Sequence, residues 1–398
     1  MIVAGGCYVE RCTLPVWDQR FGSGGRAAAA VSDLSPGTEL HTFCPPGNEQ
    51  KIQAVMGVFG IGVTATPSSE MVEFTYFHPL SIPEIHPTPA HIQRAAPLRV
   101  KGEVVLRFSF MEGEAIVEAK TAVYDPQSGG VREPFRANGS TADRLAIVLN
   151  EGELRSMANE EDLDAAATAL IASEGADVIV AKCGTKGATV YEADGGRVEV
   201  PAYFSDAVFK IGSGDVFSGA FTHFWAEAGK SPAEAADLAS RAVALYCGTR
   251  ALPIPPDPTA LASLTPLRTG TAGMIYIAAP FFTIGQRWLM EEARASLLAL
   301  GADVFSPLHE VGTGDPDDVI ATADIEGLER CTAVLALLDG GDPGSLVEVG
   351  WARARDIPVV VLAEAVRPSD LTMPRGLGCE IVGDFATALY RAVWASVR

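Results

Sequence analysis

The chain has 398 residues, which exceeds the usual size of one domain, and 48% of them are hydrophobic, so we expect two domains with buried cores. Its formal net charge at pH 7 is −20. This charge argues against a nucleic-acid backbone or an anionic membrane as a partner, because both bind clustered cations.

Signals for a membrane, an export route or a metal are weak in this sequence. No apolar run approaches the roughly 18 to 20 residues that cross a bilayer. The first residues reach Glu10 and Arg11 too early for a secretory signal. The seven cysteines form no CxxC pair, which indicates neither a zinc knuckle nor a disulfide framework. We therefore expect a soluble, cytoplasmic protein.

Residues 1–255 are expected to form the first domain. Up to about Tyr124 the sequence is typical of strands, as at 71–80 and in the alternating stretch 100–110. Beyond that point, short apolar strands alternate with helices: strands at 145–150 and 177–184, and a helix at 160–173. This order predicts a parallel sheet with helices on both faces.

A glycine-rich stretch, "FKIGSGDVFSGAF", occupies residues 209–221 and leads into an apolar pattern of helical spacing. The amides of such a turn point toward one spot, and the helix dipole adds a positive field, so Gly212 and Gly214 predict an anion site. Asp215 would stand beside a phosphate bound there, where a carboxylate can take the proton of an attacking hydroxyl. From this motif alone, a simple helix cap is an equally good interpretation.

Other polar or glycine-rich positions in this domain follow strands or precede a helix. "VLNEGE" places Asn150 and Glu153 just past a strand end, where polar groups collect in α/β sheets. The remaining positions are Lys182, Gly184 and Gly187 in "AKCGTKGATVY", and Gly24 and Gly25 in "FGSGGRAAAA", where a Gly-Gly turn before a helix is expected.

Together these motifs resemble ribokinase-like (PfkB-type) sugar and nucleoside kinases over most of residues 1–255, in the family's order. The family's G-A-G-D, N-x-x-E and K-x-G-x-x-G signatures stand here as G-S-G-D, N-E-G-E and K-C-G-T-K-G. The resemblance implies a doubly wound α/β sheet with a β lid. It also implies phosphoryl transfer from ATP, with Mg²⁺, to an alcohol.

The same resemblance implies roles for single residues. Asp215 would be the catalytic base. The other implied roles are an anion hole at Gly212, Ser213 and Gly214, cofactor binding at Lys182, Gly184 and Gly187, organisation of Mg²⁺ by Asn150 and Glu153, and sugar binding at Gly24 and Gly25.

Three positions depart from the family pattern. Phe209 replaces the aspartate that usually stands three residues before the G-A-G-D motif, and Glu10 takes the place of the sugar-binding aspartate. The asparagine that usually follows the Gly-Gly pair is absent from "GGRAAAA". The sequence therefore predicts catalytic groups that are present and sugar recognition that is altered.

A stretch rich in Pro, Thr and Gly separates two segments that each restart with a strand-like run, so we place a linker at 256–273 and a second domain at 274–398. Strands are predicted at 274–280, 302–307, 332–340 and 358–364, and helices at 286–301 and 345–356. Gly301 stands at the expected helix C-cap. The pattern predicts a small flavodoxin- or Rossmann-like domain.

Carboxylates and a phenol gather in this second domain. Asp342 and Glu348 flank the turn after a buried strand, and Asp324 is expected to start the preceding helix. Tyr276 lies on the first strand. This set fits chemistry at an anomeric carbon, where one carboxylate attacks and another moves a proton at the leaving group. As a structural alternative, Ser345 to Glu348 reads as a capping box.

Residues 274–365 resemble nucleoside 2-deoxyribosyltransferases and their N-glycosidase relatives, with "IYIAAP" and "DPGSLVEVG" at the family motifs. The resemblance implies that Glu348 is a nucleophile that forms a ribosyl ester, that Tyr276 orients it, and that Asp324 handles the proton at the base. Ser345 replaces a threonine of the substrate site. A homo-oligomer is also implied, because a neighbouring subunit often completes the site.

Asp342 distinguishes two branches of that second family. Hydrolases of nucleoside 5′-monophosphates tend to carry serine six residues before the catalytic glutamate, and this position is Asp342 here. A carboxylate repels a phosphate but accepts a hydrogen bond from a free 5′-hydroxyl. The expected substrate is therefore a nucleoside.

Two orders of reaction connect the domains. The second domain can split a nucleoside so that the kinase phosphorylates the freed pentose, or the kinase can act first and the second domain can cleave the nucleotide. Asp342 favours the first order. The expected partners are a nucleoside, a pentose and ATP. A nucleoside sensor or scaffold with a degenerate kinase domain is the alternative of another class.

Overall fold

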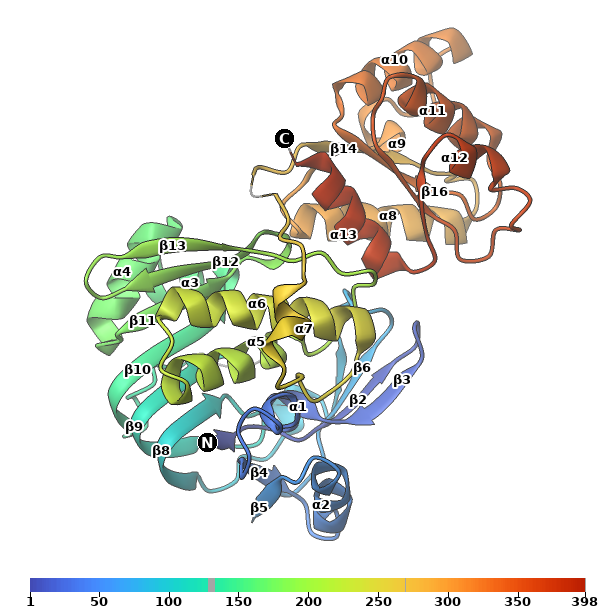
Figure 1. Cartoon of the computed structure of the whole chain (residues 1–398). Coiled ribbons are helices and arrows are strands. Elements are labelled where there is room, and N and C mark those ends of the chain that lie inside the picture. The colour runs from blue at the N-terminus through green and yellow to red at the C-terminus, as the bar shows by residue number, and fades with distance from the viewer. Residues whose placement is uncertain (128–132, 269, 398) are drawn as a thin grey trace. The chain divides into compact units, whose positions relative to one another are not determined.

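The computed structural model describes residues 1–127, 133–268 and 270–397 (Figure 1). The chain forms two compact units, Met1–Pro266 (unit 1) and Leu267–Arg398 (unit 2). Each unit is an α/β domain with its own sheet, so the predicted fold class is confirmed.

Unit 1 contains a nine-stranded sheet in the order β13-β12-β11-β10-β9-β8-β1-β4-β5. Its strands are β1 (Ile2–Ala4), β4 (Glu39–Cys44), β5 (Gly62–Pro67), β8 (Leu98–Phe108), β9 (Ala115–Asp125), β10 (Thr141–Asn150), β11 (Val178–Lys182), β12 (Gly187–Glu192) and β13 (Arg197–Pro201). The strands are parallel from β5 to β11, and β12 and β13 are antiparallel. Strand order reverses at β1, which lies between β4 and β8.

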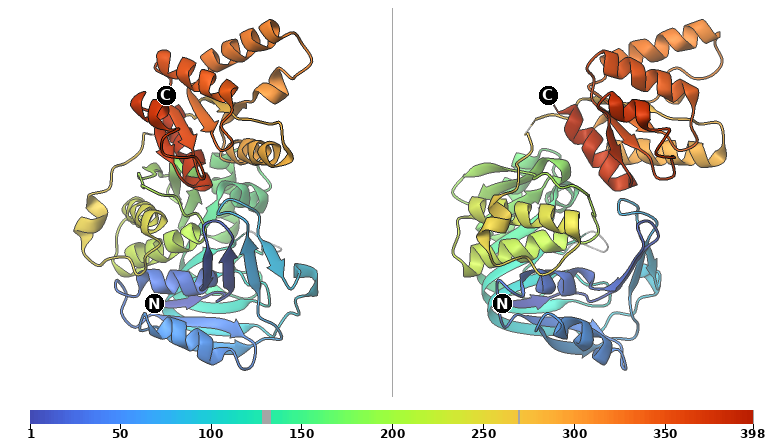
Figure 2. Two further views of the ribbon diagram at one scale, coloured as in Figure 1. Left: turned by 90° about the vertical axis from the view of Figure 1, so that its right-hand side faces the viewer. Right: turned by 45° about the vertical axis from the view of Figure 1, so that its right-hand side comes forward.

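Helices cover both faces of this sheet (Figure 2). One face carries α1 (Gly22–Val31), α5 (Ser213–Thr222) and α6 (Pro232–Thr249), and the other carries α3 (Glu151–Ala158) and α4 (Leu163–Glu174). In β10, Ala146 and Val148 pack toward the first set, whereas Leu145, Ile147 and Leu149 pack toward the second. Because side chains alternate across a strand, an apolar run of this kind is buried on both sides.

A second, four-stranded sheet, β3-β2-β6-β7, supplies the predicted lid. Its strands are β2 (Val9–Cys12), β3 (Trp17–Arg20), β6 (Glu73–Tyr76) and β7 (Glu84–His86). The same part of the chain also holds α2 (Glu49–Gly57), a helix that the strand-rich reading of this region does not predict. Glu10 and Tyr76 of the lid line the cavity described below, so the lid belongs to the site.

The glycine pair near the N-terminus does not form the predicted turn before a helix. Helix α1 already begins at Gly22, and Gly24 and Gly25 lie within its first turns. A Cβ atom on Gly24 would lie 2.5 Å from the carbonyl group of Gly5, so the two backbones touch. The contact requires glycine for packing.

Unit 2 is a five-stranded parallel sheet in the order β15-β14-β16-β17-β18. Its strands are β14 (Met274–Ala278), β15 (Asp303–Phe305), β16 (Ala333–Leu337), β17 (Val359–Leu362) and β18 (Glu380–Val382). Its helices are α8 (Ile284–Ala299), α9 (Pro307–Glu310), α10 (Asp317–Arg330), α11 (Pro343–Ala354), α12 (Thr372–Gly376) and α13 (Phe385–Ser396). Strand order reverses at β14, between β15 and β16.

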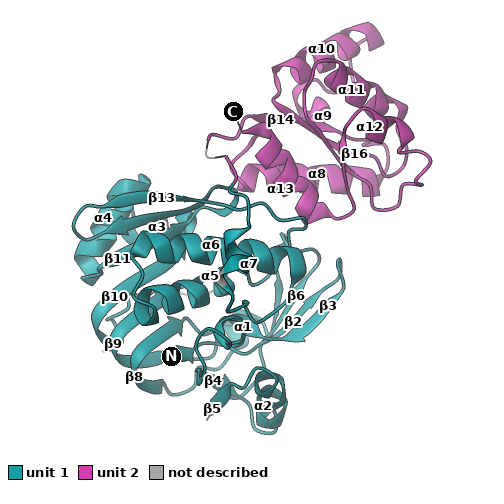
Figure 3. Ribbon diagram, in the orientation of Figure 1, with its two compact units in different colours: residues 1–266 teal, residues 267–398 magenta. Residues whose placement is uncertain are grey.

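The two units divide at Pro266, inside the predicted linker 256–273 (Figure 3). The first part of that stretch is packed on unit 1. It forms α7 (Pro258–Ala262), and Leu261 is buried in the core of unit 1. Thr269 lies outside the described residues.

Among the described residues, no helix combines the length and the apolar character that a bilayer crossing requires.

We predict that Gly24→Ala destabilises unit 1 by about 1–3 kcal/mol, because the new methyl group overpacks a backbone contact with Gly5. Gly57→Ala, at the end of α2, is the matched control, since a Cβ atom there meets nothing within 4 Å. Urea unfolding, monitored by hydrogen exchange of the amides in unit 1, measures the stability of both variants. Equal stability of the two variants would contradict the packing role of Gly24.

Candidate functional sites

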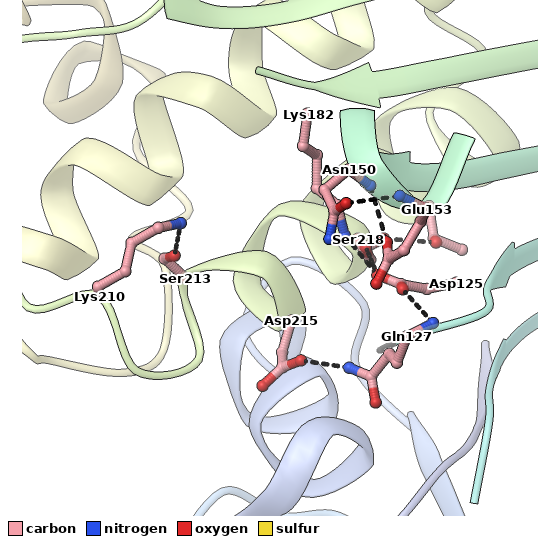
Figure 4. Close-up of polar contacts among 10 residues, drawn as sticks. Asp125, Gln127, Asn150, Glu153, Lys182, Lys210, Ser213, Asp215 and Ser218 are labelled. Atoms are coloured by element: carbon pink, nitrogen blue, oxygen red, sulfur yellow. Dashed lines mark hydrogen bonds and ion pairs between the residues drawn. The ribbon is translucent and has the colours of Figure 1, made fainter. Parts of the chain in front are cut away.

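A cavity of about 560 Å³ lies at the carboxyl ends of the parallel strands of unit 1. Figure 4 shows the polar contacts among several of the residues that line it. Polar side chains from the ends of β9, β10 and β11 and from the start of α5 line it: Asp125, Gln127, Asn150, Glu153, Lys182 and Asp215. In open parallel sheets, ligands bind at such a strand edge next to the point where strand order reverses.

The glycine-rich motif forms the start of α5. Gly212 is the N-cap residue, with a φ of 76°, and Asp215 is the third residue of the helix. Residues 202–211 separate the motif from β13. The first amides of α5 nevertheless form the positive end of this helix, which is favourable for an anion.

Two lysines stand at this helix end. The Nζ atom of Lys210 donates to the Ser213 hydroxyl at 2.7 Å, and Lys182 Nζ lies 3.5 Å from the place of a Cβ atom on Gly214. Burial lowers the pKa of Lys210. Lys182 was expected from the sequence. Lys210 was not, because a lone lysine in a loop carries no motif.

Both carboxylate oxygens of Asp215 accept hydrogen bonds. Gln127 Nε2 donates to Oδ1 at 2.9 Å, and Arg26 Nη1 donates to Oδ2 at 3.0 Å. Burial raises the pKa of Asp215 to about 6, although the Arg26 charge opposes the rise. A pKa near neutrality suits a group that must both take and return a proton.

Arg26, like Lys210, is a residue that the sequence interpretation missed. Its side chain is 0% exposed and forms a two-pronged ion pair with Glu10 on the lid strand β2. Gly212 permits this arrangement, since a Cβ atom there would collide with the Arg26 guanidinium. The available signal was a cation inside the otherwise apolar run "GGRAAAAV", because such a charge must find a buried partner.

Asn150 and Glu153 form a capping box at the start of α3. Asn150 Oδ1 accepts from the Glu153 amide, and Glu153 Oε2 accepts from the Asn150 amide, both at 2.8 Å. Nearby, Lys182 Nζ donates to Asp125 Oδ2 at 2.7 Å, and the Ser218 hydroxyl donates to the same oxygen at 2.6 Å. Both side chains of the box also line the cavity, so they stabilise the start of α3 and can contact a bound ligand.

The remaining predicted glycines of unit 1 have backbone roles. Gly184 has a φ of 57° and Gly187 a φ of 105°, and a Cβ atom on Gly187 would collide with Val200. Gly24 and Gly25 are buried, and the cavity is lined instead by the preceding Gly22 and Ser23. The structure therefore does not bring Gly24 or Gly25 to the cavity wall.

In unit 2, the predicted phenol and carboxylate meet. Tyr276 on β14 donates its hydroxyl hydrogen to Glu348 Oε1 on α11, at 2.7 Å. Tyr276 is fully buried and stacks on Phe305, with ring centroids 5.5 Å apart. Burial raises the pKa of Glu348 to about 7, whereas the Tyr276 hydrogen bond lowers it.

Asp324 lies in the middle of α10, because the helix begins at Asp317 and not at Asp324 as predicted. Its Oδ1 atom is buried and has no hydrogen-bond partner among the described residues. Burial raises the pKa of Asp324. Its charge also raises the pKa of Glu348, which places both carboxylates in one electrostatic environment.

Asp342, and not Ser345, is the N-cap of α11. Asp342 Oδ2 accepts from the amide of Ser345 at 2.7 Å and from its hydroxyl at 2.9 Å. The capping box expected between Ser345 and Glu348 is therefore wrong. Aspartate caps the helix, which leaves Glu348 one turn further along for its contact with Tyr276.

Solved structures of ribokinase-family enzymes share this fold. The chain is similar to aminoimidazole riboside kinase from Salmonella enterica, solved with aminoimidazole riboside and an ATP analogue, with 16% identity and a TM-score of 0.50 over 66% of this chain and 100% of that chain. It is also similar to a Burkholderia thailandensis nucleoside kinase in complex with inosine (16% identity, TM-score 0.48, 63% and 90% covered). Ribokinase from Thermotoga maritima is a third example, with 16% identity and a TM-score of 0.44 over 67% of this chain and 95% of that chain.

The fold and the two sites thus define an α/β protein with a ribokinase-like first domain. Residues 120–259 match the model of the pfkB family of carbohydrate kinases, and residues 275–384 match that of the nucleoside 2-deoxyribosyltransferases. The chain is a fusion of a PfkB-type kinase domain with a nucleoside 2-deoxyribosyltransferase-like domain. No curated protein matches it.

We predict that Glu348→Gln stabilises unit 2 at pH 8 by up to about 3 kcal/mol. The folded pKa of Glu348, about 7, lies above the ordinary 4.5, so between these values the unfolded chain has already lost a proton that the folded chain keeps. Wild-type stability therefore falls as the pH rises through this window, and a neutral side chain removes the loss.

Hydrogen exchange of the β16 amides at pH 4.5 and pH 8 measures this effect in the full chain. The control is Glu329→Gln, whose carboxylate is held on the surface by Trp351 and Arg355 and should give no gain. If Glu348→Gln changed the stability by the same amount at both pH values, the raised pKa of Glu348 would be contradicted.

Proposed function

We propose that this protein is a bifunctional enzyme of nucleoside metabolism. Unit 2 cleaves the N-glycosidic bond of a nucleoside through an ester on Glu348, and unit 1 phosphorylates the released pentose with ATP. The observation that carries the proposal is the 2.7 Å hydrogen bond from Tyr276 to Glu348 inside a deoxyribosyltransferase-like domain.

In unit 2, the ionised Glu348 attacks the anomeric carbon of the sugar. Tyr276 donates to Oε1, which fixes the carboxylate and directs its other oxygen to the carbon. As the bond to the base breaks, Asp324 supplies a proton to the leaving nitrogen, a role that a partly buried carboxyl of raised pKa can perform. Water, or a second base, then attacks the ribosyl ester and restores Glu348.

Asp342 selects the substrate of this step. Its Oδ2 atom holds Ser345, so we assign Oδ1 to receive the 5′-hydroxyl of the sugar. A 5′-phosphate in the same place would meet the charge of Asp342 as well as that of Glu348, which raises the cost of binding a nucleotide. The substrate of unit 2 is therefore a nucleoside.

In unit 1, Asp215 removes the proton of the attacking hydroxyl, while the first amides of α5 and Lys182 hold the transferred phosphoryl group. Mg²⁺ would neutralise the donor phosphates. The donor set fits this ion, because Mg²⁺ needs only one or two carboxylates besides phosphate and water, and Glu153 lines the cavity. Asn150 would act mainly by fixing Glu153 through the capping box.

A sensor or scaffold is the second candidate, because both oxygens of Asp215 already accept hydrogen bonds within the chain. This observation concerns unit 1 only. Unit 2 retains the complete set of Tyr276, Asp324 and Glu348 whatever the activity of unit 1.

A homo-oligomer is part of the proposal. The helix that carries Glu348 also exposes apolar residues: Leu346, Val347 and Trp351. Val347 and Trp351 are four residues apart and therefore neighbours on one face of the helix, and exposed apolar neighbours of this kind are typical of an interface. Their position next to Glu348 agrees with a site that a neighbouring subunit completes.

We predict that purified protein releases base from a nucleoside without ATP, and that Glu348→Ala abolishes this release while Asp215→Ala does not. Pentose phosphate should form only with Mg·ATP and should require Asp215. Mass spectrometry of reactions with a panel of ribo- and deoxyribonucleosides measures both products. The exposed Glu329→Ala and Asp143→Ala variants are the controls.

Base release that depends on ATP and on Asp215 would reverse the order of the two steps. Binding of nucleosides without turnover in either unit would support the sensor and would contradict the enzyme.

A further inference from the structure

Asp215 is held by two donors that differ in kind. On Oδ2 the donor is Arg26, a charged group, at 3.0 Å. On Oδ1 the donor is the neutral amide of Gln127, at 2.9 Å. Both bonds end on the carboxylate, but the Arg26 bond adds the attraction between two opposite charges, so the two oxygens are held with unequal strength.

The Arg26 side of the carboxylate is locked by its surroundings. Arg26 is 0% exposed, and Glu10, which is 5% exposed, clamps both of its terminal nitrogens. The ring of Phe21 lies 5.4 Å from the guanidinium carbon, and the Cα of Gly212 packs against the guanidinium. Moving Arg26 would leave Glu10 as a buried, unpaired charge, which is strongly unfavourable.

The Gln127 side can open. Gln127 lies on the cavity wall, is only partly buried, and holds a left-handed backbone conformation with a φ of 46°. Its amide is neutral, and an exchange of its hydrogen bond for one from another neutral donor costs little. Figure 4 shows the carboxylate of Asp215 and the side-chain amide of Gln127 turned toward each other, and both residues line the cavity.

We propose that the Glu10–Arg26 pair positions Asp215 by fixing Oδ2, and that Oδ1 is the oxygen that receives the acceptor hydroxyl, in the place now taken by the Gln127 amide. Arg26 and Glu10 are thus positioning residues, and Gln127 is a placeholder that the acceptor displaces. This inference rests on the proposed kinase function of unit 1.

The chemical step then balances as follows. The acceptor hydroxyl gives its proton to Oδ1, and its oxygen forms a bond to the terminal phosphorus of ATP. The bond from that phosphorus to the bridging oxygen breaks, and ADP leaves with the electron pair. Arg26 stays on Oδ2 throughout, which keeps Asp215 ionised before the step and turned toward the acceptor.

The charged and titratable groups that face Asp215 come from several elements: Arg26 on α1, Glu10 on β2, Tyr76 on β6, Asp125 at the end of β9, Lys182 at the end of β11, Lys210 just before α5, and Tyr246 on α6. Arg26 lowers the pKa of Asp215, whereas Glu10 and Asp125 raise it. Removal of Arg26 and removal of Glu10 should therefore shift Asp215 in opposite directions. A residue that only supports the fold would not produce this pattern.

The test measures phosphorylation of ribose, 2-deoxyribose and inosine by Mg·ATP against pH, in Arg26→Gln, Glu10→Gln, Arg26→Lys and Gln127→Ala. We expect the acid limb of kcat to move to higher pH in Arg26→Gln and to lower pH in Glu10→Gln. Arg26→Lys should restore the position of the limb while kcat falls at least tenfold. Gln127→Ala should lower KM for the acceptor several-fold without a comparable change in kcat.

The same variants, labelled with ¹³C at aspartate, give the pKa of Asp215 by NMR titration without any turnover. Opposite NMR shifts without phosphorylation of any acceptor by the wild type would support the positioning role and reject the kinase function. Phosphorylation with an unmoved Asp215 pKa in Arg26→Gln and Glu10→Gln would overturn the inference. So would an increase of KM in Gln127→Ala. Thermal unfolding of each variant identifies any that fails to fold. If Arg26→Gln or Glu10→Gln fails, the kcat of Arg26→Lys and the KM of Gln127→Ala still test the inference.

Discussion

Both sites depend on one constraint, which is that the connections after neighbouring parallel strands leave toward opposite faces of the sheet where strand order reverses. In unit 1 this place is at β1, between β4 and β8, and in unit 2 it is at β14, between β15 and β16. The loops that follow the strands cannot cover the gap there, and polar side chains from several elements meet in it. Tyr276 and Glu348, 72 residues apart, come within hydrogen-bond distance for this reason.

Each site places a carboxylate in a poorly solvated position and then limits the effect of burial in its own way. The positive charge of Arg26 opposes the rise in the pKa of Asp215, and the hydrogen bond from the phenol of Tyr276 opposes the rise in the pKa of Glu348. The cation leaves the pKa of Asp215 at about 6, and the phenol leaves that of Glu348 at about 7. A base needs a proton affinity near the working pH, and a nucleophile needs its negative charge directed at one carbon, so the two partners suit two roles.

Much of this arrangement could be predicted from the sequence, because it depends on local patterns. The alternation of strand-like and helix-like apolar patterns predicts the two α/β units. Short motifs point to Asp215, Tyr276 and Glu348 as candidate site residues. Contacts between distant segments could not be predicted in this way. The burial of Arg26 between Glu10 and Asp215 joins residues up to 189 positions apart, and no spacing rule encodes it.

Errors of the sequence interpretation also have physical causes. "SLVE" and "NEGE" both fit a capping box, yet only Asn150 and Glu153 form one, because in α11 the earlier Asp342 already accepts the hydrogen bonds of the first turn. The family resemblance implied that the Gly-Gly pair binds the sugar. In the structure the closely approaching group is the backbone of Gly5. A glycine motif indicates that another group comes close to the backbone, but which group it is depends on the tertiary fold.

The distribution of charge connects the two proposed activities. Lys182 and Lys210 stand at the helix end of unit 1, and the chain has no lysine beyond Lys230. In unit 2, Asp324 and Asp342 both add negative potential at Glu348. A neutral nucleoside can enter such a site and a phosphorylated one is repelled, whereas the cationic helix end of unit 1 attracts phosphate. In the order that we propose, phosphorylation would also prevent the pentose from returning to unit 2, and this charge distribution is the reason to propose that cleavage precedes phosphorylation.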